Sequence, residues 1–161
     1  MGTGKTAVGK ELSRILHMKL IDVDTEIEKS EKMTISEIFK QFGEPRFREI
    51  ETKMLKKISK NKNAIISTGG GAVLKQENMD ILRKEGVIIC LTATPETILS
   101  RTSTNNYRPL LQVENPLERI KVILDLRKPF YEKADIMINT EGKTPLLIAE
   151  EIIEKILNSK L

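Results

Sequence analysis

The sequence is poor in the residues that mark several large classes of protein. It has no tryptophan and a single cysteine, Cys90, so it cannot form an internal disulfide. Aromatic residues make up 4% of the chain, too few for a surface that stacks nucleic-acid bases. No apolar run approaches the roughly 20 residues that span a bilayer, and no secretory signal precedes the first motif. We therefore expect a cytoplasmic monomer that binds neither nucleic acid nor membranes.

The composition that remains is that of one globular domain. The chain has 161 residues, of which 39% are hydrophobic and 31% are charged, with a formal net charge of +4. A chain of this length can bury a substantial core. We predict a single domain over residues 1–161.

The chain opens on most of a phosphate-binding loop. In the P-loop pattern G-x-x-x-x-G-K-[ST], Gly4-Lys5-Thr6 supplies the last three positions. Glycines at 2 and 4 let backbone N–H groups approach phosphate oxygens, Lys5 would reach the β- and γ-phosphates, and Thr6 would bind Mg²⁺. An amphipathic helix follows from Lys5, and a helix N-terminus favours an anion. The alternative is a glycine-rich tail without function.

Two acidic residues end the next predicted strand, residues 19–24. Asp22 and Asp24 would point to opposite faces while the strand lasts, one toward the nucleotide's metal and one toward a second substrate. The alternative is that Asp24 only caps a helix over Thr25–Ser30.

Arg48 and Glu51 are three residues apart on a predicted helix that begins near Pro45. Spacing alone favours an ordinary solvated ion pair. The alternative is that Glu51 orients Arg48, whose guanidinium then binds a substrate carboxylate with two hydrogen bonds.

Three consecutive glycines, Gly69-Gly70-Gly71, follow a predicted strand over residues 63–68. They would place bare backbone with free N–H groups at the ligand-binding end of the sheet, or else form a plain flexible turn. Residues 102–111 are polar and contain Arg108-Pro109. They indicate either a lid that brings positive charge to the transferred phosphate or a surface loop.

Helices and strands alternate along the whole chain, which predicts a parallel α/β sheet. Taken together, the motifs closely resemble the shikimate kinase family over nearly the whole chain. The resemblance rests on Gly2-Thr3-Gly4-Lys5-Thr6, Asp22-Val23-Asp24, Gly43-Glu44 with Phe47-Arg48 and Glu51, Gly69-Gly70-Gly71, Arg108-Pro109-Leu110-Leu111, and Arg127 before Pro129-Phe130-Tyr131. It implies a three-layer α/β/α fold of the P-loop, nucleoside-monophosphate-kinase-like type. It also implies a substrate-binding region near residues 23–60 and a mobile lid near residues 102–115.

The resemblance implies an ATP- and Mg²⁺-dependent phosphorylation of the 3-hydroxyl of shikimate, in the biosynthesis of chorismate and aromatic amino acids. Asp24 would hold the substrate hydroxyls and help to remove the proton, while Lys5 and Arg108 would meet charge on the transferred group. Thr6 and, through water, Asp22 would bind Mg²⁺. The nucleotide would contact Gly2, Thr3, Gly4, Lys5, Thr6, Ala7, Arg108 and, at the adenine, Lys143. The substrate would contact Asp24, Arg48, Glu51, Gly69, Gly70, Gly71 and Arg127.

The departure from the family is at the N-terminus, because the first P-loop glycine and the central strand before it would both precede Met1. Burial of such a strand contributes on the order of 7–15 kcal/mol, as much as the whole net stability of a domain. We therefore expect this chain to fold poorly if expressed from Met1, and the working protein to start upstream. Two alternatives stay open: a related small-molecule kinase of the gluconate type, and a catalytically impaired, truncated nucleotide-binding remnant.

Overall fold

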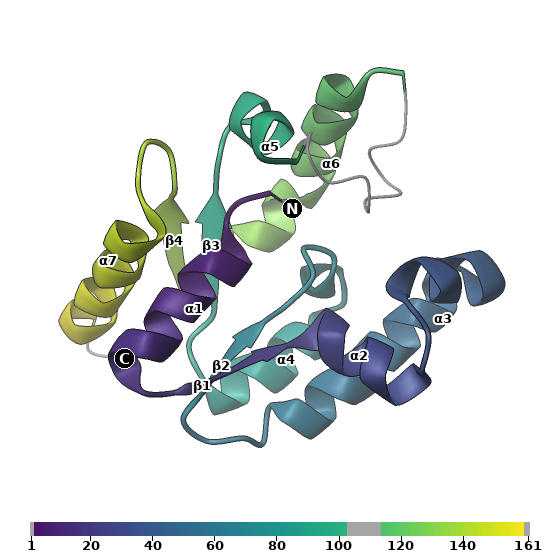
Figure 1. Ribbon diagram of the computed structural model, residues 1–161, viewed down its shortest axis with the longest axis horizontal. Helices are drawn as coiled ribbons and strands as arrows, with labels where there is room; N and C mark the ends of the chain where they lie inside the picture. Colours follow the sequence, from purple (N-terminus) through teal and green to yellow (C-terminus); the bar gives the residue numbers. More distant parts are fainter. Residues whose placement is uncertain (1, 103–113, 160–161) are drawn as a thin grey trace. The chain divides into compact units, whose positions relative to one another are not determined.

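The computed structural model describes residues 2–102 and 114–159. The predicted lid near 102–115 therefore falls almost entirely outside the described residues, and so does Arg108. The elements in chain order are α1 (Lys5–Leu16), β1 (Lys19–Asp22), α2 (Val23–Glu31), α3 (Ile35–Ile58), β2 (Ala64–Ser67), the 3₁₀ turn η1 (Ala72–Leu74), α4 (Gln76–Glu85), β3 (Ile89–Thr92), α5 (Pro95–Thr102), α6 (Pro116–Tyr131), β4 (Ile136–Asn139) and α7 (Pro145–Asn158) (Figure 1).

The chain forms an α/β fold that divides into two compact units. The terminal unit comprises Met1–Val8 and Ile88–Leu161, and the middle unit comprises Gly9–Val87. Each unit contains one pair of parallel strands, β3 with β4 in the terminal unit and β1 with β2 in the middle unit. The predicted parallel pairing is confirmed, but in the described part of the chain it gives two two-stranded sheets instead of one continuous sheet.

In the middle unit, α2 and α3 pack against each other beside the β1–β2 pair (Figure 1). Leu20 lies opposite Ile65 and Ile21 opposite Ile66 in the strand register. Apolar side chains from α2, α3, β1 and η1 form one buried cluster, and Phe39 packs on Phe47 with ring centroids 4.7 Å apart. The cluster consists of Ile21, Val23, Ile27, Ile38, Phe47, Ile50, Met54, Leu55, Ile58 and Ala72. It fixes the face of α3 that carries Phe47, so the following residue, Arg48, has a defined direction.

Gly43 interrupts α3 in its middle. Its backbone has φ 77° and ψ 171°, outside the helical region, and Pro45 follows in the next turn. The first half of α3 begins at a capping box, in which Thr34 accepts from the Glu37 N–H and the Glu37 carboxylate accepts from the Thr34 N–H. The helix that the sequence predicts to begin near Pro45 is confirmed as the second half of α3, after the break at Gly43.

In the terminal unit, α7 packs on β4, and α5 packs on α6 (Figure 1). Strand β4 alternates buried and exposed side chains, with Ile136 and Ile138 directed into the core. Pro116 opens α6 and Pro145 opens α7, since proline is well suited to the first position of a helix.

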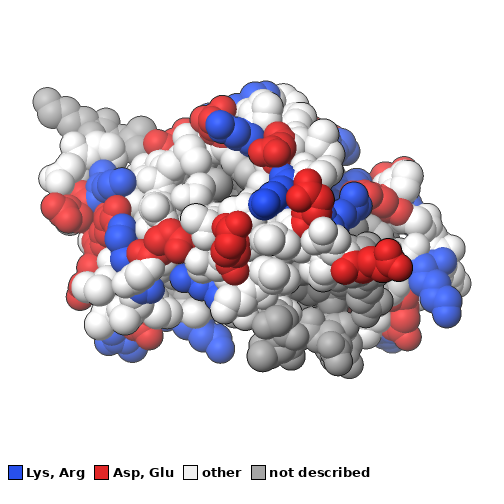
Figure 2. All heavy atoms as spheres, turned by 90° about the horizontal axis from the view of Figure 1, so that it is seen from above, with Lys and Arg blue, Asp and Glu red and all other residues white. Residues whose placement is uncertain are grey.

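Acidic and basic side chains are intermixed on the face shown in Figure 2, in keeping with the scattered charges of the sequence. Among residues 2–102 and 114–159, none of the helices combines the length and apolar character that crossing a membrane requires.

Candidate active site

The phosphate loop turns on two glycines with left-handed backbone. Gly2 has φ 64° and Gly4 has φ 87°, and α1 begins immediately afterwards at Lys5. A Cβ on Gly2 would lie 2.9 Å from Thr102 Cγ2, so a side chain there would also collide with α5. Both positions therefore require glycine.

The start of α1 fits the anionic phosphates of a nucleotide. The Val8 N–H donates to the Gly4 carbonyl at 2.9 Å. The N–H groups before Val8 are those of the first helical turn, which make no hydrogen bond within a helix. These N–H groups and the positive end of the helix dipole favour an anion. Lys5 and Thr6 belong to this first turn, as the sequence predicts.

The two acidic residues after β1 do not lie on opposite faces of a strand, and this prediction was wrong, because side chains two residues apart in a strand share a face and because the strand stops before Asp24. The strand ends at Asp22, which is the N-cap of α2 and accepts a hydrogen bond from the Thr25 N–H at 3.1 Å. Asp24 lies in the first turn of α2. An aspartate at the N-cap accepts a hydrogen bond from an N–H group of the first helical turn. Asp22 fills this role, so α2 starts at Val23, and the cap is Asp22 instead of Asp24.

Arg48 and Glu51 form an ion pair in which Glu51 is buried and Arg48 is partly exposed. Arg48 Nη1 donates to Glu51 Oε2 at 2.8 Å, and the Glu51 side chain is 0% exposed. The expectation of an ordinary solvated pair was wrong, because Glu51 packs inside the middle unit. Burial raises the pKa of Glu51, and the nearby Arg48 guanidinium opposes that rise. Glu51 thus holds the guanidinium of Arg48 in place from the buried side of α3. This arrangement agrees with the alternative given by the sequence, in which Glu51 orients Arg48.

The glycine loop after β2 lies against these charged side chains. A Cβ on Gly71 would lie 2.7 Å from Arg48 Cζ and 2.8 Å from Nη1, so the guanidinium occupies the space that any side chain would need. A Cβ on Gly69 would lie 3.4 Å from Asp24 Oδ1 and 3.5 Å from Glu51 Oε1. Gly70 lies between them in the chain. Asp24, Arg48 and Glu51 therefore converge on this loop, as the resemblance implies.

Three polar residues that the sequence analysis did not single out lie around the glycine loop and α3, and one hydrogen bond among them, from Lys75 to Thr52, joins the two segments. Asn78 Nδ2 donates to the Ala72 carbonyl at 3.0 Å, directly after the glycines. Thr52 Oγ1 donates to the Arg48 carbonyl at 2.9 Å and accepts from Lys75 Nζ at 3.2 Å. Asn78 and Thr52 are buried, and because their burial comes from packing between segments that are distant in the chain, local spacing in the sequence carries no signal for them.

The remaining predicted residues belong to the terminal unit. Arg127 lies on α6 and is partly buried. Lys143 lies in the loop before α7, where its Nζ donates to Glu151 Oε2 at 2.6 Å. Thr3 is buried, while Thr6 and Ala7 are exposed on α1.

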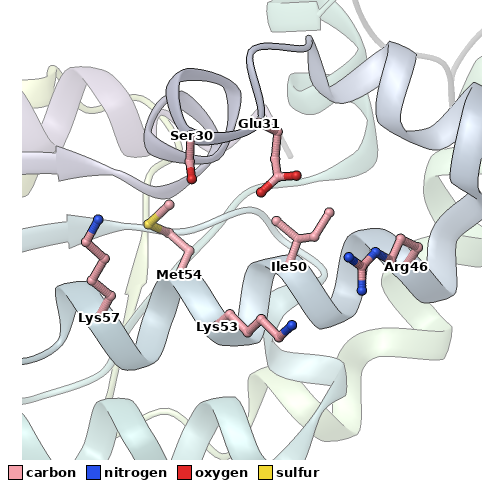
Figure 3. A pocket seen from close by; sticks show the side chains of 7 residues that line it. All are labelled: Ser30, Glu31, Arg46, Ile50, Lys53, Met54 and Lys57. Carbon is pink, nitrogen blue, oxygen red and sulfur yellow. The ribbon is translucent and has the colours of Figure 1, made fainter.

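A separate hollow of about 210 Å³ opens between α2 and α3 (Figure 3). Its lining residues are Ser30, Glu31, Arg46, Ile50, Lys53, Met54 and Lys57. None of these is a predicted site residue. Arg46 pairs with Glu49 at 2.7 Å on this side of the helix, whereas Arg48 is directed at Gly71.

Each unit carries one feature of a recognisable class of protein. A P-loop at a helix N-terminus binds the phosphates of a nucleotide, and an anchored arginine beside an aspartate offers a place for a small hydroxylated anion. This combination is that of a P-loop phosphotransferase that acts on a small molecule.

Comparison with known proteins gives the particular family. The sequence profile described as shikimate kinase matches residues 1–157. The shikimate kinase of Thermodesulfovibrio yellowstonii is 54% identical, over 99% of this chain and 94% of that protein. That of Caldicellulosiruptor saccharolyticus is 46% identical, over 95% of this chain and 89% of that protein. The solved structure of shikimate kinase from Acinetobacter baumannii in complex with shikimate is 38% identical and has a TM-score of 0.95, covering 100% of this chain and 90% of that one. This chain belongs to the shikimate kinase family.

Proposed function

We propose that this chain transfers the terminal phosphoryl group of ATP to the 3-hydroxyl of shikimate, giving shikimate 3-phosphate, as a cytoplasmic monomer. The product lies on the route to chorismate and the aromatic amino acids. The observation that carries the proposal is the Arg48–Glu51 pair, held at 2.8 Å against Gly71 with one partner fully buried. A guanidinium fixed in this way is prepared for a planar carboxylate, which is the charged group of shikimate.

Asp24 supplies the second contact with the acceptor. Its carboxylate lies beside Gly69, in the same cluster as Glu51 and Arg48. In our proposal it accepts hydrogen bonds from the substrate hydroxyls and takes the proton of the hydroxyl that is phosphorylated. Hydrogen bonds to hydroxyl groups discriminate strongly, because an analogue without those hydroxyls forfeits the hydrogen bonds that the site is built to make.

The donor is held by the P-loop. The backbone of residues 2–7 would bind the phosphates of ATP, and Lys5 would neutralise charge on the transferred group. Bound Mg²⁺ would supply charge neutralisation and orientation of the phosphates. Thr6 would contact it directly and Asp22 through water, in keeping with the few protein ligands that Mg²⁺ needs. The described residues contain no cluster of three or more His, Cys, Asp or Glu side chains that could hold a metal without the nucleotide.

Three further assignments rest on the resemblance alone. Arg127 would be a second arginine for the substrate carboxylate, and Lys143 would lie along the adenine. Arg108, which lies outside the described residues, would meet charge on the transferred phosphate. The Lys143–Glu151 contact shows that this lysine has an internal partner at 2.6 Å, which adenine binding would have to accommodate.

The test is coupled ADP release with MgATP and either shikimate or gluconate as the acceptor. We expect turnover with shikimate, none with gluconate, and loss of activity when EDTA removes Mg²⁺. Asp24→Asn should lower kcat by about 10²-fold or more, since a positioned general base contributes 10²–10⁴-fold. Turnover of gluconate in preference to shikimate would overturn the substrate, and a folded protein that releases no ADP with either would support the remnant.

A further inference from the structure

The guanidinium of Arg48 donates hydrogen bonds to two carboxylates, those of Glu51 and Glu44. A guanidinium has five N–H donors, and two of its edges can take a carboxylate with two parallel bonds. Arg48 Nη1 donates to the buried Glu51. On the neighbouring edge, Nε donates to Glu44 Oε1 at 3.1 Å and Nη2 donates to the same oxygen at 2.8 Å. One of the two edges that suit a ligand carboxylate is therefore held by Glu44.

The two glutamates differ in how firmly they hold the arginine. Glu51 is 0% exposed, whereas the Glu44 side chain is 52% exposed and uses one oxygen for both bonds. Removing Glu51 from Arg48 would leave a buried charge without its partner, which is costly. Removing Glu44 returns a carboxylate to water, and exposed pairs of this kind are worth about 0.2–1 kcal/mol. Glu44 is thus the carboxylate that a ligand can displace.

The Glu44 contact follows from the local fold. Glu44 directly follows the non-helical Gly43 and is four residues before Arg48, so the helical turn brings the two side chains together. The other face of the guanidinium is closed by Gly71, and Phe47 lies beneath it, with Arg48 Cζ 5.1 Å from the ring centroid. With these sides closed, a carboxylate that reaches Nε and Nη2 must replace Glu44.

We infer that Glu44 is an internal competitor, a residue that sets the affinity of the acceptor site because it occupies the edge of Arg48 to which the substrate carboxylate binds. This inference rests on the proposed function, in which Arg48 binds that carboxylate. Glu44 weakens the binding of every anion by the same factor, so it lowers each affinity and leaves their ratio unchanged. A ligand whose hydroxyls also bind Asp24 can still displace Glu44 at a low concentration. A simple carboxylate or phosphate needs a much higher concentration to do so.

The experiment compares Glu44→Gln with Glu49→Gln by calorimetric titration with shikimate in the absence of nucleotide. Both changes remove one negative charge from α3, but Glu49 pairs with Arg46, at 2.7 Å. The two sites point away from each other, because residues 46 and 48 are about 200° apart on a helix. We expect Glu44→Gln to lower the Kd for shikimate roughly two- to fivefold, the fold-change of an exposed ion pair. It should strengthen inhibition by acetate or inorganic phosphate by the same factor. Glu49→Gln should change neither.

A third variant separates this inference from the function on which it rests. Arg48→Lys keeps a positive charge for Glu51 but removes the fork, and it should weaken shikimate binding by about tenfold or more. If Arg48→Lys binds as wild type does, the assignment of Arg48 is wrong and the inference falls with it. A second outcome is that Arg48→Lys weakens shikimate binding but Glu44→Gln does not strengthen it, either because Glu44→Gln also weakens binding or because it behaves like Glu49→Gln. In that case Arg48 keeps its role and Glu44 is not a competitor. Equal tightening by both glutamine variants would show a general charge effect and would also overturn the inference. Circular dichroism and the unfolding midpoint confirm that each variant is folded.

Discussion

The guanidinium of Arg48 lies directly over the Cα of Gly71, with Cζ 2.7 Å from the position that a Cβ would take. The backbone at Gly71, φ −97° and ψ −7°, is one that any residue can adopt. Glycine is therefore required at this position for space alone, and the space is filled by the side chain that we assign to the substrate carboxylate.

The first prediction follows from this contact. Gly71→Ala should push the arginine from its place and raise the KM for shikimate by about tenfold or more, since hydrogen bonds to a charged group are worth about 1.5–3 kcal/mol. The KM for ATP should change much less. Steady-state kinetics with each substrate varied in turn measures both. The matched control is Gly86→Ala, because a Cβ at Gly86 has nothing within 4 Å. An unchanged KM for shikimate in Gly71→Ala would show that Arg48 can move without loss.

Glu51 gives a prediction on pH. Its pKa is raised by burial, so the folded protein holds the Glu51 proton more tightly than the unfolded chain does. The stability that this proton provides is fully present below the unfolded pKa near 4.5 and is lost as the pH rises through the higher pKa of the folded state. Glu51→Gln cannot titrate, so wild type should lose stability relative to this variant as the pH rises across that interval.

Urea midpoints for wild type, Glu51→Gln and Glu49→Gln, measured from pH 4 to 8, test this expectation. Glu49 is exposed, and its substitution should give a difference from wild type that hardly changes with pH. If the difference in urea midpoint between Glu51→Gln and wild type also stays constant with pH, the charge of Arg48 cancels the effect of burial on the Glu51 pKa.

Asn78 gives a prediction on stability. It is fully buried, its Nδ2 donates to the Ala72 carbonyl at 3.0 Å, and its Oδ1 has no hydrogen-bond partner among the described residues. Asn78→Asp removes the donor and buries a charge, so it should cost about 2–4 kcal/mol at neutral pH. The cost should shrink as the pH falls, because a protonated carboxyl can donate to Ala72 again.

The control for this variant is Asn61→Asp. Asn61 makes the same kind of bond, from Nδ2 to the Ile58 carbonyl at 2.8 Å, but it is exposed. Its substitution should cost less than about 1 kcal/mol, and its pH dependence should be small. Similar urea midpoints for the two variants would contradict the idea that burial makes Asn78 important for the loop.

The donor side of the reaction is tested by Lys5→Met. This change removes the positive charge from the first turn of α1 and should lower kcat by about 10²-fold or more, the usual cost of losing one group that stabilises transition-state charge. Lys10→Met is the control, since Lys10 is exposed on the same helix five residues later. Full activity in Lys5→Met would remove the P-loop lysine from the mechanism.

The sequence predicted those features that depend on local spacing. The sequence predicts the P-loop turn at Gly4, the pairing of Arg48 with Glu51 and the helix start near Pro45 from residues within a few positions of one another. The competition between Asp22 and Asp24 for the N-cap was decided by where β1 ends, which pairing with β2 controls.

Burial could not be predicted in the same way. Glu51 is an ordinary helical glutamate by spacing, and it is buried because the loop after β2, far along the chain, packs on α3. The role of Asn78 has the same origin, since its partner Ala72 follows that loop. The Glu44–Arg48 spacing was visible, but only the coordinates show that one oxygen holds two of the arginine's donors.

The break at Gly43 also divides α3 into two halves that one core holds. Ile38 before the break and Phe47 after it belong to the same buried cluster, while Phe42 between them is 49% exposed. Because the backbone at Gly43 is not helical, no continuous helix from the start of α3 sets the direction of Arg48. The direction of the arginine is therefore a property of the tertiary packing around Phe47 and not of the helix that carries it.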